Sequence, residues 1–158
     1  MQASRRALVV LLLALTGCAA QGPRYQPAAL DPLEGQGVIY VYRPMLQVGK
    51  RGESPYVTVN GTSYGAMRPG AFIAANVPSG EIKVTVQQSV FLLLPTIPKT
   101  VEVTVVPGSI SYVRVNQAID SVGSGGAAGG VQVTQSISIE EVPFDVGQTE
   151  LEATRQNN

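Results

Sequence analysis

The chain has 158 residues and carries 11 Lys and Arg against 11 Asp and Glu, so it lacks the positive balance typical of a nucleic-acid-binding domain. It contains no His, no Trp and a single Cys, which excludes a disulfide within one chain and metal sites built from imidazole or several thiolates. We therefore expect no metal, no cofactor and no nucleic-acid partner.

The first residues have the pattern of a bacterial lipoprotein signal. Arg5 and Arg6 precede the uncharged apolar stretch Ala7–Leu15, which is too short for a transmembrane helix of about 20 residues and suits a secretory signal peptide. Small residues then lead to Cys18, as a lipoprotein signal peptidase requires. We expect residues 1–17 to be removed and Cys18 to carry acyl chains such as palmitate that anchor the protein in a membrane. The alternative is an ordinary signal peptide followed by an incidental cysteine.

The residues after the cysteine predict the location and a tether. Ala19 follows Cys18. In bacteria with two membranes an Asp there is a common inner-membrane retention signal, so we expect an outer-membrane lipoprotein that faces the periplasm. Residues 18–36 are rich in Pro and Gly, which break helices and strands. They predict a flexible tether that could hold the domain tens of Å from the membrane, at about 3.1 Å per residue.

Residues 37–142 have the pattern of an all-β domain. Apolar and polar residues alternate in short runs, Asn60-Gly61 is a strong hairpin signal, and Gly and Pro recur between the runs. Closely spaced turns favour an antiparallel β-sandwich of seven or eight strands. Val38, Tyr40 and Tyr42 should face opposite to Ile39 and Val41. The predicted strands cover residues 38–42, 56–59, 63–67, 71–77, 81–86, 100–105, 110–115 and 131–142.

Two further segments complete the predicted organisation. Residues 123–130 (GSGGAAGG) predict a flexible hairpin loop between the last two strands. Residues 143–158 predict a C-terminal tail with a short helix, with Asp145 as a possible N-cap and residues 156–158 frayed at the end.

The segment 90–98 is unusual because it connects two alternating strands and yet is almost wholly apolar, with two prolines. A connecting loop is normally polar and exposed. One interpretation is an exposed patch for a partner or a lipid surface, and the other is a plug that closes an open end of the sandwich. The candidate partner-binding residues are Phe91, Leu92, Leu93, Leu94 and Ile97.

No catalytic set emerges from the sequence. A serine nucleophile would lack a His base, and no Ser-x-x-Lys arrangement is present. The glutamates fall on alternating positions and at strand ends, which fits solvated faces better than a glycosidase pair. The glycine-rich loop lacks the Lys-Ser/Thr of a phosphate-binding loop. The six tyrosines could form a ligand platform, but most occupy strand positions where core packing is the simpler explanation.

Four motifs occur in an order that resembles a known family. They are Ile39–Pro44 (IYVYRP), Tyr56–Gly61 (YVTVNG), Val77–Gly80 (VPSG), and Pro107-Gly108 before ISYVRV at residues 110–115. The pattern resembles small bacterial lipoproteins catalogued as a domain of unknown function, which look like distant relatives of PEGA and carboxypeptidase regulatory-type β-sandwiches. The chain departs from that pattern at Ser79 and in the glycine-rich loop. The resemblance implies a non-enzymatic envelope domain and supplies no active site.

Three functional hypotheses follow. The first is a non-catalytic envelope lipoprotein that acts as an interaction or scaffold domain in the periplasm, held to the membrane by lipid on Cys18 and bound to another envelope protein. The second is a binding module for cell-wall glycan or another envelope ligand, and the third is an enzyme. The tyrosines discriminate between the first two, because a surface cluster in a groove favours ligand binding and burial favours a scaffold.

Overall fold

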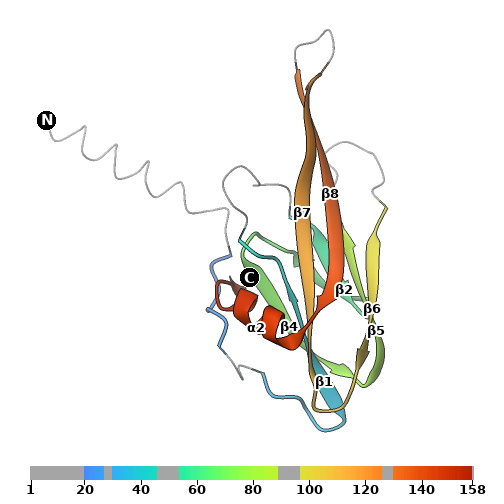
Figure 1. Cartoon of the computed structure of the whole chain (residues 1–158). Helices are drawn as coiled ribbons and strands as arrows, with labels where there is room; N and C mark the ends of the chain where they lie inside the picture. The colour runs from blue at the N-terminus through green and yellow to red at the C-terminus, as the bar shows by residue number, and fades with distance from the viewer. Residues whose placement is uncertain (1–19, 27–29, 46–53, 89–96, 126–129, 158) are drawn as a thin grey trace, which may run out of the picture.

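The computed structural model describes residues 20–26, 30–45, 54–88, 97–125 and 130–157. They form two packed β-sheets with one short helix on the outside (Figure 1). The strands are β1 (Gln36–Tyr42), β2 (Tyr56–Val59), β3 (Thr62–Ala66), β4 (Ala71–Pro78), β5 (Gly80–Gln87), β6 (Lys99–Val105), β7 (Ile110–Gly125), β8 (Gly130–Val142) and β9 (Arg155–Gln156), and the helix is α2 (Phe144–Leu151).

The sheets confirm the predicted all-β sandwich with a short C-terminal helix. One sheet has the strand order β8-β7-β1-β4-β9 and the other has the order β3-β2-β5-β6. Most neighbours are antiparallel, but β1 pairs with β7 and β4 pairs with β9 in parallel. The sequence did not predict these two pairings, because alternation along a strand does not report the direction of its neighbour.

The main core lies between the two sheets and follows the predicted alternation. Ile39 and Val41 of β1 point into it, together with valines of β2, β5, β6 and β7. Val38, Tyr40 and Tyr42 point to the opposite side of the sheet. Each large apolar side chain that is fully buried contributes about 1.5–3 kcal/mol to folding, so this packing holds the sheets together.

A second hydrophobic layer covers the outer face of the five-stranded sheet. Tyr25 packs edge-on against Tyr40 and Phe72, with ring centroids 5.4 and 5.9 Å apart, and Tyr40 stacks on Tyr112 at 5.7 Å. Helix α2 closes over this layer at Gly147, where a Cβ atom would lie 2.4 Å from Cγ of Tyr112. The aromatic face is therefore covered by residues 20–26 and by α2.

The segment predicted as a free tether is in part docked on the domain. The exposed fractions of Ala20 and Tyr25 are 5% and 8%. The Tyr25 N–H donates to the Thr154 carbonyl at 3.3 Å, and the Gln156 N–H donates to the Pro23 carbonyl at 2.7 Å. Residues 20–26 thus cover the outer edge of β9, and we call residues 20–26 with β9 the anchor edge.

The C-terminal tail differs from the prediction in two details. Asp145 is not the N-cap: the helix begins at Phe144, its N-cap residue is Pro143, and no side chain caps it. Gln156 and Asn157 are not frayed, since Gln156 belongs to β9 and the Asn157 N–H donates to the Phe72 carbonyl at 2.8 Å. Tertiary hydrogen bonds, which no local pattern announces, fix this end.

The last two long strands project beyond the sandwich as a two-stranded ribbon (Figure 1). The predicted loop 123–130 was too long, because β7 continues to Gly125 and β8 begins at Gly130, with Gly123 opposite Gln132. Backbone pairing between the strands therefore includes several of the glycines that suggested a flexible linker. We call residues 115–125 and 130–139 the arm, which begins at Val115, Ile137 and Ile139 on the core and continues into the ribbon.

Candidate functional site

The structure places few of the residues selected from the sequence. Cys18 and Phe91, Leu92, Leu93 and Leu94 lie outside the described residues. Ile97 is described, and 82% of it is exposed just before β6. The choice between an exposed patch and a core plug stays a prediction for the rest of that segment.

Most tyrosines are buried and do not form a surface platform. The exposed fractions of Tyr25, Tyr40, Tyr42 and Tyr112 are all 8% or less, whereas Tyr56 is 50% exposed. The first four belong to the covered aromatic layer of the five-stranded sheet. Because buried rings cannot contact a sugar, this burial favours a scaffold over a glycan-binding surface.

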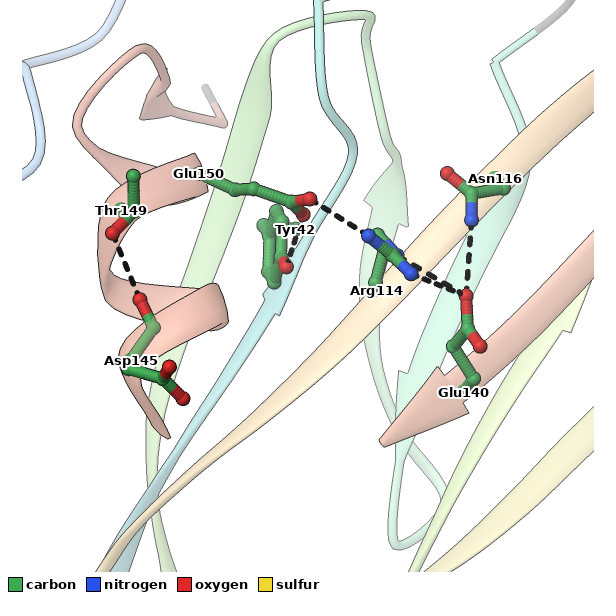
Figure 2. A network of polar contacts seen from close by, with 7 residues as sticks. All are labelled: Tyr42, Arg114, Asn116, Glu140, Asp145, Thr149 and Glu150. Atoms are coloured by element: carbon green, nitrogen blue, oxygen red, sulfur yellow. Dashed lines mark hydrogen bonds and ion pairs between the residues drawn. The ribbon is translucent and has the colours of Figure 1, made fainter. Parts of the chain in front are cut away.

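A polar network connects helix α2 to three strands (Figure 2). Glu150 of α2 accepts a hydrogen bond from the Tyr42 hydroxyl at 2.6 Å and another from Nη1 of Arg114 at 2.7 Å. Nε and Nη2 of Arg114 both donate to Oε1 of Glu140, at 3.1 and 2.9 Å. Asn116 donates to the same oxygen at 3.2 Å. Arg114 thereby lies between two carboxylates and ties β1, β7, β8 and α2 together.

The electrostatics of the network fix its protonation. Burial, then the hydrogen bond and charge of Glu150, raise the pKa of Tyr42 well above its usual value, so this hydroxyl remains a donor. Burial alone would lower the pKa of Arg114, but the two glutamates outweigh it and raise the pKa. Arg114 is therefore a permanent cation that binds both carboxylates. The network is better explained as a clamp that holds α2 than as an acid–base pair.

A second arginine, Arg43, is fully buried where the arm leaves the sandwich. Its backbone N–H donates to the Ala71 carbonyl at 2.9 Å. In its side chain, Nη1 donates to the Met67 carbonyl at 3.1 Å and Nη2 donates to Oε1 of Gln117 on β7. Burial lowers the pKa of Arg43 to about 10, and hydrogen bonds offset the cost of burying the charge. The Arg of the Tyr-Arg-Pro motif thus joins the end of β1 to the base of the arm.

The arm is a site that the sequence interpretation missed. The pairing of β1 with β7 ends at Arg114, and in the described part of the chain no strand pairs with that side of β7 beyond it. On the other side, β8 is an edge strand of its sheet. Native edges are commonly blocked by Lys or Pro, but residues 115–139 contain no Pro, Lys or Arg and only one charge, Asp120. That composition was the available signal.

Among the described residues, no group of three or more His, Cys, Asp and Glu side chains could hold a metal ion. The same part of the chain has no helix long and apolar enough to cross a membrane.

The comparison with protein families gives a match over residues 33–127 to the family described as Protein of unknown function (DUF2846). The chain belongs to this family. The match confirms the resemblance to a domain of unknown function, and no curated protein matches the chain. The DUF2846 region begins before β1 and ends after β7. It therefore includes Arg43 and Arg114 but not Glu140 or Glu150, so the clamp on α2 uses residues outside the matched region.

Proposed function

We propose that this protein is a lipid-anchored lipoprotein of the outer membrane, facing the periplasm, that acts as a non-catalytic interaction or scaffold domain for another envelope protein. The observation that carries the proposal is the arm, because no further strand pairs with its outer edges in the described part of the chain and its sequence contains one charged residue, Asp120. An open edge can accept an extended strand of a partner, with main-chain hydrogen bonds supplying the affinity. At about 3.3 Å per residue, residues 118–125 offer roughly 26 Å of edge.

Two further observations support a scaffold. Four tyrosines are buried beneath α2 and residues 20–26, so they serve packing. The carboxylates of Glu140 and Glu150 form ion pairs with Arg114, and these pairs have a structural role. Among the described tyrosines, Tyr56 is the one half-exposed ring that could contact a glycan.

The lipid anchor is tested in cells with Cys18→Ser. The unchanged protein should incorporate labelled palmitate and fractionate with outer membranes, whereas the variant should be unprocessed or soluble. A variant that still fractionates with membranes through detergent-sensitive lipid would contradict the assignment of the anchor.

The interaction is tested by shortening the arm. Ala118 and Ser136 are cross-strand partners, so replacing residues 119–135 with Asn-Gly closes the hairpin at an existing pair. The unchanged chain should recover one protein in stoichiometric amount from crosslinked envelopes. The short-arm variant should keep its melting temperature and should no longer recover that protein. Recovery of the same protein by both chains would exclude the arm, and recovery of peptidoglycan alone would favour the glycan-binding alternative.

A further inference from the structure

The anchor edge brings the start of the mature chain onto the folded domain. Ala20 is 5% exposed, and its N–H donates to the Pro69 carbonyl at 3.4 Å. Arg24 forms a β-bridge with Arg155 of β9, and Nη1 of Arg155 donates to the Gly22 carbonyl at 3.4 Å. The chain is therefore attached to the sheet within two residues of Cys18.

This attachment limits how far the domain can lie from a lipid on Cys18. Two residues span at most about 7 Å when fully extended, whereas a free tether of residues 18–36 would span tens of Å. If Cys18 is acylated, as we propose above, the surface around Ala20 must lie at the level of the lipid headgroups.

The charge of this surface differs from that of the whole mature chain. Residues 20–26, 67–72 and 154–157 contain Arg24, Arg68 and Arg155 and no Asp or Glu. Without Arg5 and Arg6, the mature chain has 9 Lys and Arg against 11 Asp and Glu, as counted from the full sequence. Three of these nine basic residues thus lie in segments without an acidic residue, next to the point where the chain leaves the domain toward Cys18.

Backbone contacts hold the three arginine-bearing segments together. The Arg155 N–H donates to the Gly70 carbonyl at 2.8 Å, and the Arg68 N–H donates to Oδ1 of Asn157 at 3.2 Å. Met45, which is 54% exposed, lies over Gly70, where an added Cβ would be 2.7 Å from Cε of Met45. An exposed apolar side chain among cations is the composition that binds the interface of an anionic membrane.

We propose that the anchor edge, with Arg24, Arg68, Arg155 and Met45, is a membrane-binding surface for anionic lipid headgroups. The domain lies directly on the bilayer, and the lipid on Cys18 together with this basic surface forms a two-part anchor. The acyl chains on Cys18 hold the protein at the membrane, and the basic surface adds an electrostatic contact that orients the domain on anionic lipid. This inference rests on the lipidation of Cys18, but its first test does not.

The first test uses the unlipidated mature chain with Cys18→Ser and vesicles that contain phosphatidylglycerol or only phosphatidylcholine. Each Arg near an anionic surface changes partitioning about fivefold. The double variant Arg24→Gln with Arg68→Gln should therefore bind the anionic vesicles about 25-fold more weakly. Binding should also be lost in 0.5 M salt, because salt screens exposed charges.

The matched control removes two positive charges elsewhere. Lys83 and Lys99 lie on β5 and β6 of the other sheet, and Lys83→Gln with Lys99→Gln should bind as the unchanged chain does. Equal loss in the two double variants would overturn the proposal, because it would show a response to net charge alone. Absence of binding to the anionic vesicles would overturn it too.

The second test uses the lipidated full chain on a supported bilayer and measures the protein density profile by neutron reflectometry. The domain should contact the headgroups with no intervening water layer. A chain with about 20 Gly and Ser residues inserted after Cys18 should show such a layer, since a flexible linker of that length has a mean span of about 25 Å.

The two proposals fail in different ways. A water layer beneath the unchanged, lipidated domain would overturn the membrane-binding surface and leave the lipoprotein assignment intact. A Cys18 that carries no lipid by mass spectrometry would overturn the lipoprotein assignment, while the vesicle experiment would still decide whether the surface binds anionic lipid.

Discussion

Buried tyrosines should limit the stability of this protein at high pH, and Tyr42 allows the sharpest test. The Tyr42 side chain is fully buried, and its hydroxyl donates to Glu150 at 2.6 Å. Burial, followed by the hydrogen bond to Glu150, raises the pKa of Tyr42 above the ordinary value of 10.0. The folded state therefore holds the phenol proton more tightly than the unfolded chain does, and its stabilising contribution is fully present below about pH 10.

Above about pH 10 the unfolded chain loses this proton while the folded state keeps it. By linkage, the free energy of unfolding then falls with a slope that approaches about 1.4 kcal/mol per pH unit. At pH 11 Tyr42 alone should have removed about 1.4 kcal/mol of stability. Burial lowers the pKa of Arg43 to about 10, which acts in the opposite direction, so the difference between two proteins is more informative than one curve.

The variant Tyr42→Phe isolates the effect. At pH 8 it should be less stable by about 1.5–3 kcal/mol, because it lacks a hydrogen bond to a carboxylate. That deficit should shrink by about 1.4 kcal/mol at pH 11. Urea unfolding of the mature Cys18→Ser chain between pH 8 and 11 measures both values, because the titrations that both proteins share cancel in the difference. Tyr56→Phe is the matched control, since that side chain is 50% exposed. A Tyr42→Phe deficit that is constant from pH 8 to 11 would refute the reasoning.

Three other changes test the packing of the molecule. Gly147→Ala should lower the free energy of unfolding although Ala favours helices, because its Cβ would overlap the ring beneath α2. Each kcal/mol lost should lower the melting temperature by about 2–4 °C, and a higher melting temperature in calorimetry would contradict this. Glu150→Gln should lower the free energy of unfolding by about 1 kcal/mol, because it weakens the bond to Arg114. It should also speed amide exchange in α2, and unchanged exchange would show that the clamp does not hold the helix. Leu92→Ser with Leu93→Ser should leave the melting temperature unchanged and abolish partner binding if the apolar segment is exposed, and a large drop on melting would identify it as a core plug instead.

The turns made most of the strands predictable. Asn60 and Gly61 both adopt positive φ, 50° and 81°, as the two-residue hairpin between β2 and β3 requires. Gly108 also has a positive φ of 75°, and it ends the strand pattern just before β7. Where a residue type demands a particular backbone conformation, the sequence marks the boundary of a strand directly.

The differences arise where tertiary pairing outweighs local composition. Residues 123–125 resemble a linker, yet β7 includes them because β8 supplies backbone partners. Residues 20–26 resemble a tether, and the single aromatic Tyr25 was the only sign that they dock. Gly147 has a low helix propensity, but its missing side chain is what allows α2 to approach Tyr112.

The polar network could not have been predicted from spacing. Tyr42 and Glu150 are separated by 108 residues, and Arg114 reaches Glu140 and Glu150 from a third element. An arginine on an alternating strand predicts a solvated side chain, which is the weakest of sequence signals. These groups come together because β7 pairs with β8 and because α2 packs against β7.

The order of strands in the larger sheet relates the two proposed surfaces to each other. The anchor edge, which includes β9, forms one side of the sheet, and β7 and β8 form the other side. Strands are about 4.8 Å apart, so β8 lies about 20 Å from β9. A membrane that binds the anchor edge therefore lies at the opposite side of this sheet from β8. Since Arg43 joins β1 to the base of the arm and Arg114 joins β7 to α2, the sheet between the two edges is braced at both points. Under the proposed scaffold function, a partner strand bound to the arm is connected to the anchor edge through this hydrogen-bonded sheet.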